Sequence, residues 1–171
     1  MDQLIQQISE NAKAATSVLN SLSTESKDEL IIKAANKINQ SRKEILTANQ
    51  LDVEDAITNE KDDAFIDRLL LTDERIDGII ETLNNISKLP DPVGKVLETW
   101  KQPNGLEISR VRTPLGTIGI IFESRPNVSA DASALCIKSG NTCILRGGSD
   151  SFHTSTLLTK FLQRGLKLAG L

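Results

Sequence analysis

The sequence contains few of the residues on which metal and thiol chemistry depend. Its 171 residues include one histidine and two cysteines, Cys136 and Cys143, with no Cys-x-x-Cys pair. A structural zinc site usually takes four Cys or His ligands, so no metal site is expected. A catalytic thiolate needs a nearby histidine or another cation, and the sequence identifies no such partner. Because both cysteines lie among apolar residues, we predict buried structural thiols.

Aromatic residues and basic charge are scarce as well. One Trp, four Phe and no Tyr leave little for the ring-stacking surfaces that bind single-stranded nucleic acid. A net charge of −3 argues against partners such as nucleic acid or an anionic membrane. No hydrophobic run approaches the length of a membrane span, and the N-terminus lacks the features of a signal peptide. The sequence therefore predicts a cytoplasmic protein that binds neither nucleic acid nor membranes.

The first half of the chain has the residue spacing of amphipathic helices. Apolar residues three and four positions apart form one stripe over residues 4–22 and a second over residues 30–45, each of which must pack against something. Ser23 can cap the second helix, and Ser26 with Glu29 fits a capping box slightly later. A short helix is expected around residues 63–71, and Thr72 can cap the next one. These patterns predict a helical N-terminal region, residues 1–92.

A different pattern follows Pro92. Two extended segments, residues 95–100 and 106–112, flank a turn that ends in Asn104-Gly105, which is typical of a β-hairpin. We expect residues 93–113 to project from the core as this hairpin. Exposed strands associate with other chains unless something covers their edges. An oligomerisation element and a purely solvated hairpin are both compatible with this pattern.

From Pro114 onward the predicted elements alternate between strand and helix. Short apolar strands are expected at residues 118–122 and 142–145, each followed by a helix, the second of which Ser149 or Asp150 can cap. Continuous apolar runs are typical of parallel strands that are buried on both faces. The fold class is therefore α/β: N-terminal helices, a projecting hairpin, and over residues 114–171 the first βαβα half of a Rossmann-like parallel sheet, an incomplete dinucleotide-binding domain.

Charged and polar residues follow both predicted strands, where ligands of open α/β sheets bind. Arg146-Gly147-Gly148 precedes a helix, so backbone N–H groups, the helix dipole and a guanidinium can converge on an anion. The alternative is a tight turn with a surface arginine.

The first strand ends in Glu123-Ser124-Arg125-Pro126-Asn127. Arg125 suits paired recognition of carboxylate or phosphate oxygens, and the Asn127 amide can donate to an oxyanion. The alternative makes Asn127 a helix N-cap and Arg125 a surface charge. Glu123 could act as a base, although one carboxylate alone is weak support for that role.

These segments together resemble the N-terminal part of the γ-glutamyl phosphate reductase family, within the aldehyde dehydrogenase superfamily. Order and spacing agree over essentially the whole chain, and the Glu-Ser-Arg-Pro-Asn-Val block is specific to the family. The matching blocks are Leu69–Thr72 with Arg75, Asp91–Gly94, Arg112–Gly119, Phe122–Val128, Leu135–Asn141 and Ile144–Gly148.

The resemblance implies an oxidoreductase of proline biosynthesis that uses NADPH to reduce L-glutamate 5-phosphate to glutamate 5-semialdehyde and phosphate, through a thioacyl group on a cysteine. It implies that Arg125 and Asn127 face the glutamyl substrate or its oxyanion. It also implies a homo-oligomer, and cofactor contacts at Phe122, Glu123, Arg146, Gly147 and Gly148.

The family's nucleophilic cysteine belongs to a later catalytic domain, and neither Cys136 nor Cys143 matches its motif. We therefore assign no catalytic residue and expect a fragment that is inactive alone. One alternative is a non-catalytic interaction or oligomerisation module derived from such an enzyme. Another is a marginally folded product whose apolar sheet edge associates non-specifically.

Overall fold

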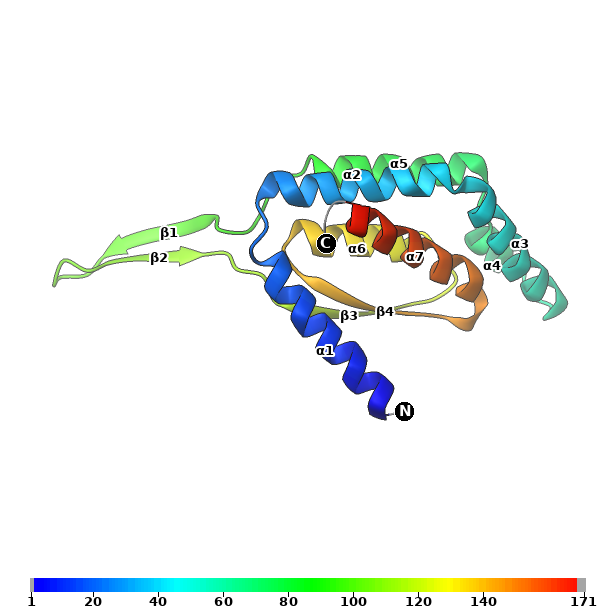
Figure 1. Ribbon diagram of the computed structural model, residues 1–171, viewed down its shortest axis with the longest axis horizontal. Coiled ribbons are helices and arrows are strands. Elements are labelled where there is room, and N and C mark those ends of the chain that lie inside the picture. Colours follow the sequence, from blue (N-terminus) through cyan, green and yellow to red (C-terminus); the bar gives the residue numbers. More distant parts are fainter. Residues whose placement is uncertain (1, 169–171) are drawn as a thin grey trace.

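The computed structural model describes residues 2–168, in which helices surround one face of a small sheet (Figure 1). Helices α2 and α5 lie side by side in one layer, α6 and α7 lie between that layer and strands β3 and β4, and α1 lies beyond the sheet. The elements are α1 (Asp2–Leu19), α2 (Thr24–Gln40), α3 (Arg42–Thr58), α4 (Asp63–Leu69), α5 (Asp73–Ser87), β1 (Val96–Lys101), β2 (Glu107–Val111), β3 (Thr117–Phe122), α6 (Val128–Lys138), β4 (Thr142–Gly147), a 3₁₀ turn (Ser149–Ser151) and α7 (Phe152–Leu168).

Several helix boundaries follow from local capping. The Ser23 hydroxyl accepts a hydrogen bond from the Ser26 N–H, and the Thr72 hydroxyl accepts one from the Arg75 N–H, each at 3.2 Å, which confirms both predicted N-caps. The stripe over residues 30–45 was expected to form one helix, and that expectation is wrong. The Ser41 N–H bonds the Ile38 carbonyl at 3.0 Å, a tightened last turn that ends α2 and lets α3 leave in a new direction.

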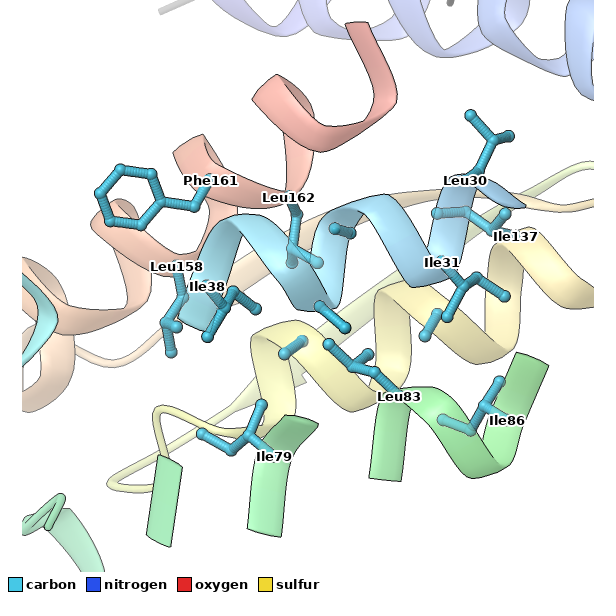
Figure 2. Close-up of a cluster of buried hydrophobic side chains, with 14 of the residues drawn as sticks. Leu30, Ile31, Ile38, Ile79, Leu83, Ile86, Ile137, Leu158, Phe161 and Leu162 are labelled. Carbon is cyan, nitrogen blue, oxygen red and sulfur yellow. The ribbon is translucent and has the colours of Figure 1, made fainter. Parts of the chain in front are cut away.

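The core lies where α2, α5, α6 and α7 meet (Figure 2). A β-carbon at Gly165 would lie only 2.5 Å from the Ala34 Cα, so α2 and α7 approach backbone to backbone. The core therefore combines helices from residues 1–92 with helices that follow Pro114. Its fully buried large apolar side chains include Leu30, Ile31, Ile38, Ile76, Leu83, Leu158 and Phe161.

Strands β3 and β4 pair in parallel, from Thr117 opposite Thr142 to Phe122 opposite Gly147, which confirms the predicted βαβα order. One face packs on α6, where the Cys143 thiol lies 3.6 Å from the Ser133 hydroxyl. On the other face of β3, Ile121 is 84% exposed, so the prediction that the strand is buried on both faces is wrong.

The position of α1 explains why this face of the sheet is exposed. This helix reaches only the first residues of the two strands, where the Thr16 hydroxyl lies 2.9 Å from the Thr142 hydroxyl. Farther from the sheet, Leu4 is 65% exposed, whereas Leu19 at the other end is buried. Of the stripe residues that the structure describes, only Leu19 is buried, so the expectation that the whole stripe over residues 4–22 is buried is wrong.

Strands β1 and β2 form the predicted hairpin, which projects from the rest of the chain (Figure 1). They pair antiparallel from Lys101 opposite Glu107, and Gly105 takes the positive φ of +87° that the turn requires. Most of the hairpin is exposed, including apolar side chains on both strands. Among residues 2–168, no helix has the length and apolar character of a membrane span.

Candidate functional site

A pocket of about 420 Å³ lies at the carboxyl end of β4, and we call it the β4–α7 pocket. Phe122 forms part of its wall, and Arg146, Gly147 and Gly148 line it where β4 ends. The structure thus brings together four of the five residues proposed from the sequence to contact a cofactor. The remaining lining residues are Leu145, Phe152, Ser155, Thr156, Thr159, Lys160 and Gln163.

The side chains of the β4–α7 pocket suit an anionic ligand. Arg146 and Lys160 are its charged lining residues, and no carboxylate lines it. The Arg146 Nη1 donates to the Gly147 carbonyl at 2.6 Å, which holds the guanidinium beside the strand end. A β-carbon at Gly147 would lie 3.3 Å from the Phe122 ring, so glycine allows this close packing. Glu123, the fifth proposed residue, is exposed beside Gly148 and does not line the pocket.

The helix that forms one side of this pocket is anchored from a distant part of the chain. The buried carboxylate of Asp52, in α3, accepts hydrogen bonds from the His153 N–H at 3.0 Å and the Thr154 N–H at 2.8 Å. Asp52 therefore caps α7, and the prediction of a cap from Ser149 or Asp150 is wrong. The partners are 102 residues apart for Thr154, and no local pattern reveals such a contact.

Arg125 and Asn127 line a second pocket of about 520 Å³, which we call the α4–α6 pocket. The sequence predicts that Arg125 and Asn127 lie near the residues proposed to contact a cofactor. Both sets of residues do lie at the carboxyl ends of β3 and β4. Their side chains nevertheless line different pockets. The α4–α6 pocket is completed by Asp67, Arg68, Leu70, Leu71, Arg75, Gly78, Ile79, Thr82 and Asp131.

Asn127 occupies the N-cap position of α6, as the alternative reading predicts, but its side chain does not cap the helix. Its amide Nδ2 instead donates to the Asp131 Oδ2 at 2.9 Å. The other oxygen, Oδ1, is buried without a hydrogen-bond partner among residues 2–168. Burial raises the pKa of Asp131, against the opposing effect of the Asn127 hydrogen bond. Sequence reasoning missed Asp131, although its position four residues after Asn127 places the two on one helix face.

The three arginines of the α4–α6 pocket differ in how they are bound. Arg75 donates to the Leu70 carbonyl at 2.8 Å and to the Asp67 carboxylate at 2.6 Å, so it fixes the turn between α4 and α5. Within the described part of the chain, Arg68 and Arg125 form no ion pair with a carboxylate, and Arg125 is exposed. Two guanidiniums therefore remain available to an anion.

Comparisons with known proteins identify relatives over nearly the whole chain. No family model matches the sequence. It is 50% identical over 169 residues to the γ-glutamyl phosphate reductase of Brucella suis and 47% identical over 161 residues to that of Clostridium kluyveri. These alignments cover 99% and 94% of this chain but only 40% and 38% of the relatives. The crystal structure of γ-glutamyl phosphate reductase from Thermotoga maritima, 43% identical, superposes with a TM-score of 0.90 over 93% of this chain and 38% of that one.

The chain matches the N-terminal portion of γ-glutamyl phosphate reductases. The fold is shared more widely. An NAD-dependent benzaldehyde dehydrogenase from Corynebacterium glutamicum superposes with a TM-score of 0.70 at 19% identity, over 95% of this chain and 32% of that one. The aldehyde dehydrogenase fold and the γ-glutamyl phosphate reductase resemblance predicted from the sequence are thus both confirmed.

Ser124, in the Glu-Ser-Arg-Pro-Asn-Val block, has no role predicted from the sequence. Ser124, directly after β3, is buried and has a positive φ of +48°. A non-glycine residue in this region carries backbone strain, which proteins retain mostly at turns and functional sites. Ser124 reverses the chain between Phe122, in the β4–α7 pocket, and Arg125, in the α4–α6 pocket, so this turn separates the two groups of residues.

The two cysteines lie away from both pockets. Cys136 is buried, as predicted, whereas Cys143, for which burial was predicted as well, is only half-buried. Their mutual hydrogen bond, together with burial, raises the pKa of Cys136, while the same bond lowers the pKa of Cys143 to about 7. Among the described residues, no group of three or more His, Cys, Asp or Glu side chains could hold a metal ion.

Proposed function

We propose that this chain supplies nucleotide- and substrate-binding surfaces of a γ-glutamyl phosphate reductase, which uses NADPH to convert L-glutamate 5-phosphate into glutamate 5-semialdehyde and phosphate. The observation that carries the proposal is the β4–α7 pocket. Residues selected for cofactor binding from the sequence gather there, in a chain 50% identical to a γ-glutamyl phosphate reductase. Because the chain spans about 40% of that relative, the reaction is proposed for the protein of which these surfaces form a part.

The β4–α7 pocket fits part of a dinucleotide in size and charge. Its volume lies within the range of small-molecule sites, about 300–1,000 Å³. We assign Arg146 and Lys160 to the phosphate groups, and Phe122 to the apolar wall. Gly147 and Gly148 let a ligand approach the backbone closely, and Glu123 is proposed to contact the cofactor from beside Gly148. NADPH would supply the hydride.

A fluorescence titration of the purified chain tests the cofactor proposal. We expect NADPH to bind, and Arg146→Gln to weaken that binding about tenfold while changing NADH binding less, because the two ligands differ by the 2′-phosphate. Lys167→Gln, which removes a charge from α7 outside the pocket lining, is the matched control. Failure of NADPH to bind, or equal weakening by both substitutions, would contradict the proposal.

We propose that the chain does not catalyse the reaction by itself. Neither cysteine of the chain lines a described pocket, so neither is placed to attack a bound acyl phosphate. Purified chain mixed with NADPH and L-glutamate 5-phosphate should consume no NADPH above the rate without protein. Turnover that survives the double substitution Cys136→Ser with Cys143→Ser would show a nucleophile that this proposal does not include.

An interaction module is the second candidate function, and the hairpin favours it. Leu97 and Leu106 are 48% and 56% exposed on a two-stranded element, and such edges pair with other chains. We propose that residues 93–113 assemble a homo-oligomer, beside a helical region at 1–92 and part of a dinucleotide-binding domain at 114–171. Light scattering should show an oligomer that Leu97→Thr shifts toward monomer. Leu115→Thr, an exposed leucine outside the hairpin, should leave the assembly unchanged.

A further inference from the structure

The α4–α6 pocket contains a carboxylate whose environment is costly for folding. Asp131 carries a buried oxygen that receives no hydrogen bond within residues 2–168, and no cation pairs with it. A carboxylate in the first turn of a helix can be explained by the helix dipole, which favours negative charge there. That explanation does not account for an unpaired buried oxygen, because unpaired buried polar groups cost stability.

The charges around Asp131 are arranged as two opposite groups within one pocket. Arg75 and Asp67 neutralise each other in an ion pair, which leaves Arg68 and Arg125 as cations and Asp131 as the anion. Arg125 and Asp131 flank Asn127 at the start of α6. A ligand that carries both a carboxylate and an ammonium group on one carbon would pair with both.

We propose that the α4–α6 pocket binds the α-amino acid end of the glutamyl substrate, with Asp131 accepting the ammonium group and Arg125 binding the α-carboxylate. The proposal rests on the proposed reductase function and names the residues that select an amino acid over a simple acyl phosphate. Asp131 lines the pocket, and the Asn127 Nδ2 holds its Oδ2 by a hydrogen bond of 2.9 Å. Asn127 is thereby a positioning residue for Asp131.

The probes are L-glutamate, glutarate, which lacks the ammonium group, and 4-aminobutyrate, which lacks the α-carboxylate. Binding to the purified chain is followed by amide shifts in ¹⁵N spectra. We expect L-glutamate to shift the amides of residues 125–131 and to bind at least about tenfold more tightly than either analogue, the value of one charged hydrogen bond. Equal binding of L-glutamate and glutarate, or no shift with L-glutamate, would overturn the proposal.

Substitutions at Asp131 and Arg125 test which group of the ligand each residue binds. Asp131→Asn should weaken L-glutamate binding about tenfold and leave glutarate binding unchanged, whereas Arg125→Gln should weaken L-glutamate and glutarate alike. Asp55→Asn, which removes one negative charge from the exposed surface of α3, should change neither. Full L-glutamate affinity in Asp131→Asn would contradict the assignment. If that variant does not fold, the preference of the unsubstituted chain for L-glutamate over glutarate still decides.

The cofactor titration separates this proposal from the reductase proposal. NADPH binding without selective L-glutamate binding would overturn the role of the α4–α6 pocket and leave the reductase function intact. Selective L-glutamate binding without NADPH binding would support the amino acid site and count against the reductase function. Loss of both would refute both.

Discussion

The helices and the strands of this chain differ in how completely the described residues cover them. Ile38, Ile76 and Leu83, on α2 and α5, are fully buried. Ile121 on β3 and Leu115 just before it are 84% and 87% exposed, although their side chains are equally apolar. Residues 2–168 thus complete a helical core but cover only one face of their sheet. Stability should therefore reside in the helices, whereas the strand ends and the hairpin offer surfaces for ligands and other chains.

The largest difference between the helices and the strands is expected when one glycine in each region is replaced by alanine. In Gly165→Ala the new β-carbon would meet the Ala34 backbone, which cannot turn away as a side chain can. We expect a loss of about 3 kcal/mol or more of unfolding free energy in a urea titration. Gly119→Ala on β3, which meets nothing within 4 Å, should cost less than about 0.5 kcal/mol. Similar losses at the two positions would refute the comparison.

Removing apolar side chains from the two regions should give unequal losses as well. Leu83→Ala should destabilise the chain by about 3 kcal/mol, because it leaves a cavity among α2, α5 and α6. Ile121→Thr removes exposed apolar surface and should change stability by less than about 0.5 kcal/mol. Thermal unfolding of both variants measures the contrast. A large loss in Ile121→Thr would indicate that another copy of the chain covers this face in solution.

The ion pair between Lys27, in α2, and Asp91 should make the stability of the chain depend on pH. Burial alone would raise the pKa of Asp91, but hydrogen bonds from Lys27, the Val93 N–H and Thr24 outweigh it and hold the pKa below its ordinary value. The resulting stability is present above the unfolded pKa of about 4 and is lost as pH falls through the lowered folded pKa. Asp91→Asn should cost about 2 kcal/mol near pH 7 and progressively less in acid. A cost that does not change with pH would exclude this linkage.

The sequence predicted those features that depend on neighbouring residues. Ser23 and Thr72 cap their helices as expected. One feature it missed is local, the break between α2 and α3 at Ser41, but the others depend on contacts between distant segments. The Asp52 cap joins α3 to α7, and the exposed face of β3 depends on where α1 diverges from the sheet.

The candidate site follows the same rule. Phe122 and Arg146 end adjacent parallel strands, and their shared pocket could be predicted from that topology. The separate location of Arg125 could not, because it depends on the reversal at Ser124 and on the side chains that α4 and α5 bring to the other side. Asp131 left a local signal in its spacing from Asn127, but its burial depends on the packed helices.

The smallest expected effect is a gain in unfolding free energy rather than a loss. It tests whether the Asp131 carboxylate serves to bind a ligand or to stabilise its helix. The pKa of Asp131 is raised by burial, so the favourable contribution of its neutral form is complete below the unfolded pKa of about 4 and is lost as pH rises through the raised folded pKa. Asp131→Asn keeps the shape without the charge. It should raise unfolding free energy near pH 7 by up to about 0.5 kcal/mol and have no such effect in acid. Asp91→Asn should instead lower the unfolding free energy near pH 7. The effects of the two substitutions on unfolding free energy should therefore change with pH in opposite directions. If Asp131→Asn instead destabilises the chain at pH 7, the carboxylate supports the helix, and its role in binding an ammonium group is refuted.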